Sequence, residues 1–150
     1  MEYGEVLKFL APCGLSCQKC FAYQDGDIRK AASTLKEKLG NFDIYARRFS
    51  SLVDPVFDNY PSFKELLSFL AAGSCLGCRA QACGLWPKCF VASCYREKKV
   101  DFCFQCQEFP CKNVNFDDHL KRRWVQMNQS MKEMGVVNYY EQTKPEPRYK

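Results

Sequence analysis

Histidine occurs only once in this sequence of 150 residues, at His119. Zinc fingers with paired histidines and catalytic zinc sites with three histidines are therefore excluded. The sequence also lacks an apolar run of the roughly 18 residues that a membrane-spanning helix needs, and residues 1–10 lack the apolar core of a secretory signal. It contains no glycine-rich phosphate loop or nucleophile elbow. We therefore expect a cytoplasmic protein with no membrane partner, and no motif favours an enzyme.

Cysteine, by contrast, is abundant, and the eleven cysteines fall into two groups. The first group is Cys13, Cys17 and Cys20, and the second is Cys75, Cys78, Cys83, Cys89, Cys94, Cys103, Cys106 and Cys111. Three pairs have the C-x-x-C spacing, in which one tight turn presents both thiolates to a single tetrahedral ion. Disulfides are rare in a reducing cytoplasm, and an odd number of cysteines fits a complete disulfide framework poorly. The pattern therefore predicts metal ligation.

Closed sites of four cysteines are typical of structural zinc, so we expect about two zinc ions. The predicted ligands of the first ion are Cys17, Cys20, Cys75 and Cys78. The predicted ligands of the second ion are Cys89, Cys94, Cys103 and Cys106. Cys13 is an alternative ligand for the first ion and Cys111 for the second, and Cys83 has no assigned site.

The main alternative is an iron–sulfur cluster, which also takes four thiolates and would make the protein an electron carrier or an enzyme. The C-x3-C-x2-C spacing of Cys13, Cys17 and Cys20 also occurs in radical enzymes that hold a four-iron cluster with adenosylmethionine. Those enzymes need a full or partial (β/α) barrel, and this sequence shows no alternation of strands and helices. A dithiol redox motif would need a thioredoxin-like βαβ pattern, which is also missing.

Hydrophobic periodicity predicts helices on both sides of the second cysteine group. Apolar residues recur at helical spacing in Asp27–Leu39, Asp43–Val53 and Ser62–Ala72. A further helix is expected from Phe116 to Met134, with Asn115 or Asp117 as its cap and Gly135 as its end. Its apolar stripe is Phe116, Leu120, Trp124, Met127 and Met131, and Pro145 and Pro147 indicate a frayed tail.

The predicted architecture is a single domain, residues 1–150, that is mostly α or α with a small irregular β part. A helical part occupies about residues 25–73, a turn-rich zinc-binding part residues 74–112, and the C-terminal helix residues 116–134. Several basic residues lie close to cysteines and are expected to stabilise their thiolates: Arg79, Lys88, Arg96, Lys98, Lys99 and Lys112.

The formal charge of +5 does not predict nucleic-acid binding, because it counts every cysteine as neutral. A zinc ion with four thiolates carries a formal charge of −2, so two such sites would leave the protein at about +1. We therefore expect no tight binding to nucleic acid. The function that the sequence favours is a structural-zinc interaction or binding module, for which a protein is the candidate partner.

Four segments resemble a cysteine-rich family of bacteria and archaea that is known as a domain of unknown function. They are the sequences CGLSCQKC at 13–20, CLGCR at 75–79, CFVASCYREK at 89–98 and CFQCQEFPC at 103–111, and the tail at 147–149 is similar too. Trp86 stands where members of the family carry a cysteine, and Cys83 is particular to this chain. The resemblance implies zinc binding, and it implies no activity or substrate.

Overall fold

The computed structural model describes residues 1–80 and 83–149, and within these the chain is helical, with no β-sheet. Two compact units are present: unit 1 combines Met1–Cys20 with Cys75–Lys150, and unit 2 is Phe21–Ser74. Unit 2 is thus inserted into unit 1 between the two cysteine groups. The predicted mostly α fold is confirmed, and the single domain stays a prediction. No helix in the described residues is long and apolar enough to cross a membrane.

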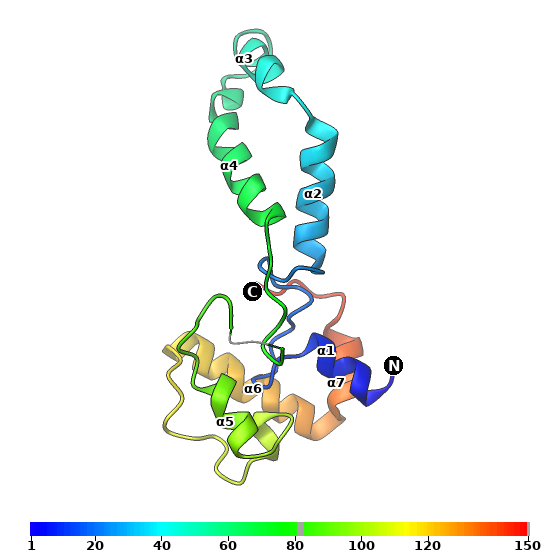
Figure 1. Cartoon of the computed structure of the whole chain (residues 1–150), viewed down its shortest axis with the longest axis vertical. Coiled ribbons are helices and arrows are strands. Elements are labelled where there is room, and N and C mark those ends of the chain that lie inside the picture. The colour runs from blue at the N-terminus through cyan, green and yellow to red at the C-terminus, as the bar shows by residue number, and fades with distance from the viewer. Residues whose placement is uncertain (81–82, 150) are drawn as a thin grey trace. The chain divides into compact units, whose positions relative to one another are not determined.

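Unit 2 contains α2 (Asp27–Leu39), α3 (Phe42–Leu52), the 3-10 helix η1 (Pro55–Asn59) and α4 (Tyr60–Ala71) (Figure 1). The three helices predicted here are confirmed to within two residues at each end. Gly26 occupies the N-cap position of α2, and Asp27 already lies in the first turn. Gly40 ends this helix, with a φ of 50°.

The packing of unit 2 leaves many apolar side chains exposed. α2 packs against α4, and α3 packs against η1. Phe42 contacts the rings of Phe49, Phe57 and Tyr60 at centroid distances of 5.0–6.1 Å. A single pair of packed helices cannot cover every apolar face, and the large exposed side chains are Leu35, Ile44, Tyr45, Leu52, Val53, Val56, Phe63, Leu66 and Phe69.

The two ends of unit 2 lie next to each other. A Cβ atom added at Gly73 would come within 2.8 Å of the carbonyl oxygen of Phe21 and 3.1 Å of the Ala22 backbone. Glycine is therefore needed for this close approach of two backbone segments. The first residues of unit 2, Phe21 and Ala22, therefore lie beside Gly73, near its last residue.

Unit 1 contains α1 (Tyr3–Phe9), α5 (Val91–Glu97), the 3-10 helix η2 (Cys103–Gln105), α6 (Asp118–Met134) and α7 (Val136–Thr143) (Figure 1). Its core is formed by apolar residues of α1, α6, α7 and the segment before η2: Val6, Leu10, Phe102, Met131, Val136, Tyr139 and Tyr140. α1 packs against α7, and α7 against α6.

The C-terminal helix begins two residues later than predicted, because the Asp117 side chain caps it by accepting a hydrogen bond from the Leu120 N–H at 2.8 Å. Gly135 ends α6 as expected, with a φ of 84°. The expected frayed tail is wrong. Val136–Thr143 forms α7, and the residues after it are held by the ammonium group of Lys19, which donates to the carbonyl oxygens of Thr143 at 2.6 Å and Glu146 at 2.8 Å.

Candidate metal centre

All eleven cysteines lie in unit 1, and the structure records each of them as a free thiol. Cys13, Cys17 and Cys20 are buried, and the cysteines of the second group are half-buried. Unit 1 therefore brings the two sequence groups into one compact body. The long-range association of the N-terminal cysteines with the second group is a feature of the fold, although the ligand sets remain predictions.

Three cysteines form a connected set, which we call the Cys78 group: Cys17, Cys78 and Cys83. Hydrogen bonds between side chains link Cys78 to both Cys17 and Cys83. The bond from Cys78 lowers the pKa of Cys17 to about 7 and that of Cys83 to about 5, while the same two bonds raise the pKa of Cys78. The single S–H proton of Cys78 can be donated to either Cys17 or Cys83, and the lowered pKa values of these two favour their thiolate forms.

A second set, the Cys103 group, consists of Cys94, Cys103, Cys106 and Cys111. Burial raises the pKa of Cys103 to about 11, and the charges of the other three cysteines add to the rise. Burial also raises the pKa of Cys94, to which the charges of Cys111 and Cys106 contribute. These mutual effects show that the four sulfurs are electrostatic neighbours. The set contains Cys111, the alternative ligand from the sequence, and it does not include Cys89.

The other four cysteines are Cys13, Cys20, Cys75 and Cys89, and the charges of Cys17, Cys89 and Cys103 act on the pKa of Cys13. Cys89 accepts hydrogen bonds from the N–H groups of Val91 and Ala92, and the thiol whose charge affects its pKa is Cys83. Cys75 accepts from the Gly77 N–H at 3.4 Å in the turn that leads to Cys78. The N–H of Cys20 donates to the Cys17 carbonyl at 2.9 Å, which forms the corresponding turn of the first group. Burial raises the pKa of Cys13 to about 12.

Backbone N–H groups point at several of these sulfurs. Besides the bonds to Cys75 and Cys89, the N–H groups of Leu85 and Trp86 donate to Cys83. Such bonds favour the charged form of an acceptor, so they stabilise a thiolate more than a thiol. In the part of the chain that the structure describes, no three His, Cys, Asp or Glu side chains stand around one point as metal ligands would. The sulfurs are neighbours that still share protons.

The basic residues contribute partly as expected. Lys98 helps to lower the pKa of Cys94, as the sequence predicted. Arg79 interacts with the charge of Cys17, as expected. Its guanidinium also donates to the carbonyl oxygens of Leu10 at 3.0 Å and Asp101 at 2.7 Å, and so ties two cysteine-bearing segments together. The charge of Arg148, at the far end of the chain, lowers the pKa of both Cys17 and Cys83. Sequence reasoning gave no sign of this contact.

Two side chains of α6 support the cysteine-bearing loops. Asn128 is fully buried and accepts a hydrogen bond from the N–H of Phe104, one residue after Cys103, at 3.0 Å. The indole N–H of Trp124 lies against the Cys103 thiol and lowers its pKa, yet it makes no hydrogen bond of standard geometry within the described residues. A buried N–H without a partner is costly.

His119 is the one histidine, and it is exposed to solvent in the first turn of α6, whereas the cysteines are buried or half-buried. The donor set of unit 1 is therefore sulfur. Soft thiolate ligands in this number suit zinc or an iron–sulfur cluster and suit magnesium or calcium poorly.

Comparison with known proteins agrees with the cysteine pattern. No curated protein and no solved structure matches the chain significantly. One family model matches residues 9–116, a range that includes all eleven cysteines, and it is described as a protein of unknown function, DUF3795. The chain therefore belongs to the DUF3795 family, as the resemblance of its cysteine segments indicated.

Proposed function

We propose that unit 1 is a zinc-binding module whose two thiolate sites hold the cysteine-rich segments in place. The observation that carries the proposal is the contact of Cys17 with Cys78, which brings thiols from the two sequence groups into one hydrogen-bonded set with Cys83. Zinc binds thiolates and releases their protons. A zinc ion in this place would replace the protons that the three sulfurs now share.

The proposed ligands follow the two sets of neighbours. The first ion is held by Cys17, Cys78 and Cys83, with a fourth thiolate from one of the C-x-x-C partners, Cys20 or Cys75. The second ion is held by the Cys103 group, in which the charges of Cys106 and Cys111 help to raise the pKa of Cys94 and Cys103. The backbone N–H bonds to Cys75 and Cys83 and the unpartnered Trp124 indole support this assignment, because thiolates are better acceptors than thiols.

The proposed biological role is that of an interaction or binding module. Its zinc sites are structural, with no open coordination position for a substrate. All-cysteine sites are usually closed and structural. Exposed apolar side chains of α3 and α4, among them Leu52 at 68% exposure and Phe69 at 64%, support a protein partner for unit 2. Eleven free thiols also support a reducing compartment such as the cytoplasm.

The test is to purify the full chain anaerobically and measure its metal by native mass spectrometry and elemental analysis. We expect a colourless protein with about two zinc ions per chain. A brown protein that contains iron and acid-labile sulfide would instead establish the iron–sulfur alternative. A chain that carries no metal and keeps the same melting temperature after treatment with a chelator would contradict both.

A further inference from the structure

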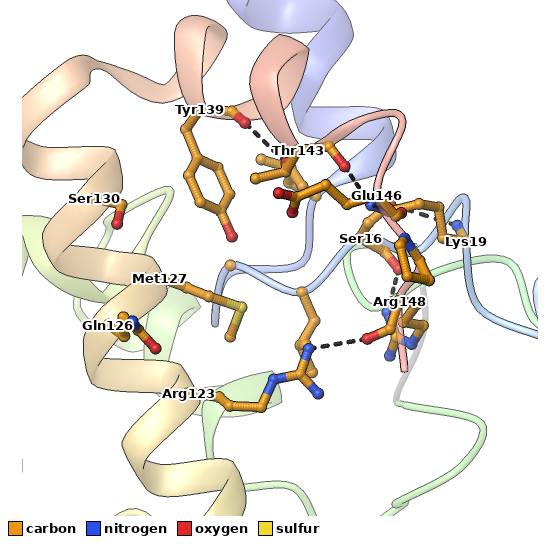
Figure 2. Close-up of a pocket in the computed structure, with 14 residues that line it drawn as sticks. Ser16, Lys19, Arg123, Gln126, Met127, Ser130, Tyr139, Thr143, Glu146 and Arg148 are labelled. Atoms are coloured by element: carbon orange, nitrogen blue, oxygen red, sulfur yellow. Dashed lines mark hydrogen bonds between the residues drawn. The ribbon is translucent and has the colours of Figure 1, made fainter. Parts of the chain in front are cut away.

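Unit 1 contains a cavity of about 310 Å³ that the zinc proposal does not use. It lies between α6, α7, the C-terminal tail and the loop that follows Cys13 (Figure 2). Its volume equals that of about ten water molecules at about 30 Å³ each, which is at the small end of the range for ligand pockets. The cavity therefore has room for a small organic molecule.

One wall of the cavity presents a phenol hydroxyl that is accessible from the cavity. Tyr139 is 7% exposed, and Figure 2 shows its hydroxyl pointing into the space beside Met127. That hydroxyl makes no hydrogen bond to any of the residues 1–80 and 83–149. Burial raises the pKa of Tyr139 to about 12, so the group is a hydrogen-bond donor at neutral pH. Its open side is the cavity, where it can donate a hydrogen bond to a ligand.

A guanidinium group lies at another part of the wall. Arg123 donates through Nη2 to the carbonyl oxygen of Arg148 at 2.9 Å, and its other N–H groups make no bond within the described residues. Lys19 also lines the cavity, but its ammonium is engaged by the carbonyl oxygens of the tail. With Arg148 and one carboxylate, Glu146, the lining has two more positive charges than negative ones.

The rest of the lining is mixed: Leu10, Leu15, Met127 and Pro147 are apolar, and Ser16, Gln126, Ser130 and Thr143 are polar. A ligand can pack an apolar body against the four apolar side chains. Guanidinium groups pair with carboxylates through two parallel hydrogen bonds. Glu146 disfavours a second negative charge near Tyr139, because its own charge helps to raise the pKa of that phenol.

We propose that this cavity binds a small organic monocarboxylate with an apolar body and a second, uncharged oxygen. The carboxylate pairs with Arg123, the body packs against the apolar wall, and the second oxygen accepts a hydrogen bond from Tyr139. A hydroxyl is the best form of this oxygen, because it can also donate to Glu146. The inference is independent of the metal, since none of these side chains is a cysteine.

The test uses 4-hydroxybenzoate as the probe and the full chain as purified, with backbone amide NMR shifts as the readout. We expect saturable shifts around Gly14 and Ser130 with a Kd on the order of 0.1 mM. Benzoate lacks the second oxygen and should bind several-fold more weakly, and 4-hydroxybenzylamine, with the opposite charge, should not bind.

Two variants and a matched control separate the contacts. Arg123→Gln should weaken 4-hydroxybenzoate at least tenfold, whereas Arg122→Gln removes the same charge one residue away on the exposed side of α6 and should change the Kd less than twofold. Tyr139→Phe should weaken 4-hydroxybenzoate and leave benzoate unchanged. Absence of saturable shifts, equal effects of the two arginine variants, or equal loss of both ligands in Tyr139→Phe would overturn the proposal.

Discussion

The side-chain amide of Asn128 donates a hydrogen bond to the carbonyl oxygen of Cys13 at 2.9 Å, across 115 positions of the sequence. The same side chain accepts from the Phe104 N–H, so α6 holds a loop of each cysteine group. The two loops are also joined directly, because the N–H of Cys103 donates to the carbonyl oxygen of Pro12 at 3.0 Å. The backbone that carries the cysteines is thus positioned from the C-terminal helix.

We predict that Asn128→Ala destabilises unit 1 by about 3 kcal/mol, because it leaves the Phe104 N–H and the Cys13 carbonyl unsatisfied in a buried place. Thermal unfolding of the zinc-loaded protein measures the effect. Asn138→Ala is the control, since its amide is exposed and donates only to the Met134 carbonyl. If both variants melted at the same temperature, the role of Asn128 would be wrong.

A second prediction concerns Gly14, which has a φ of 93°. A Cβ atom there would lie 2.9 Å from Cε of Met131 and 3.2 Å from Cβ of Met127. Gly14→Ala should therefore cost about 1–3 kcal/mol of stability. Gly4→Ala in α1 meets no atom within 4 Å and should be neutral or slightly stabilising. Chemical denaturation of the two variants checks the difference, and equal stability would contradict the geometry.

A third prediction maps the ligands. Cys83→Ser and Cys111→Ser should each lower the zinc content by about one ion, because each removes a member of a proposed site. Cys13→Ser should keep both ions, since burial holds Cys13 as a neutral thiol. Native mass spectrometry reads the stoichiometry directly. Full zinc content in Cys83→Ser, with loss of one ion in Cys89→Ser, would favour the ligand set predicted from the sequence.

A fourth prediction separates the two units. Structural zinc contributes on the order of 10 kcal/mol to the folding of small modules. Chelation should therefore expose the amides of α5, α6 and α7 to hydrogen exchange, while α2 and α4 keep their protection because unit 2 contains no cysteine. Zinc added back should restore protection in unit 1. Loss of protection in both units together would support the single domain that the sequence predicted.

A fifth prediction follows from the raised pKa of Tyr139, about 12 compared with an ordinary value of 10.0. Above pH 10 the unfolded chain loses the phenolic proton while the folded chain retains it. The unfolded state then binds fewer protons, so the contribution of Tyr139 to stability is complete below pH 10 and is lost as the pH rises towards 12. Tyr139→Phe should flatten this part of the stability profile, measured by denaturation between pH 8 and about 11. An unchanged slope would contradict it.

The sequence predicted unit 2 well because its helices are long and bounded by Gly40, Pro55 and Pro61. It missed α1 and α5, each of seven residues, because so short a helix shows hardly two turns of periodicity. α7 is not evident from the sequence because Pro145 and Pro147 follow it closely and indicate a tail. Its buried residues Val136, Tyr139 and Tyr140 do have the i, i+3, i+4 spacing of a helix face.

The cysteines were identifiable as candidate ligands from the sequence, but their grouping was not. Spacing constrains only near neighbours, such as the two sulfurs of a C-x-x-C turn. The association of Cys17 with Cys78 depends on the fold of unit 1, which brings together segments from both sides of the insertion. Asn128 gave no signal either, because a polar residue on an amphipathic helix is expected to face water.

The adjacency of Phe21 and Gly73 has a consequence for synthesis on the ribosome. Cys17 is made before the inserted helices, and Cys78 only after all of them. Helical structures with local contacts fold within microseconds to milliseconds, whereas translation adds about 5–20 residues per second. Unit 2 can therefore finish folding before the second cysteine group is complete. The folding of unit 2 then already includes the loss of entropy on closing the long loop between Cys17 and Cys78. Metal has only to join the two short segments of nascent chain that flank unit 2.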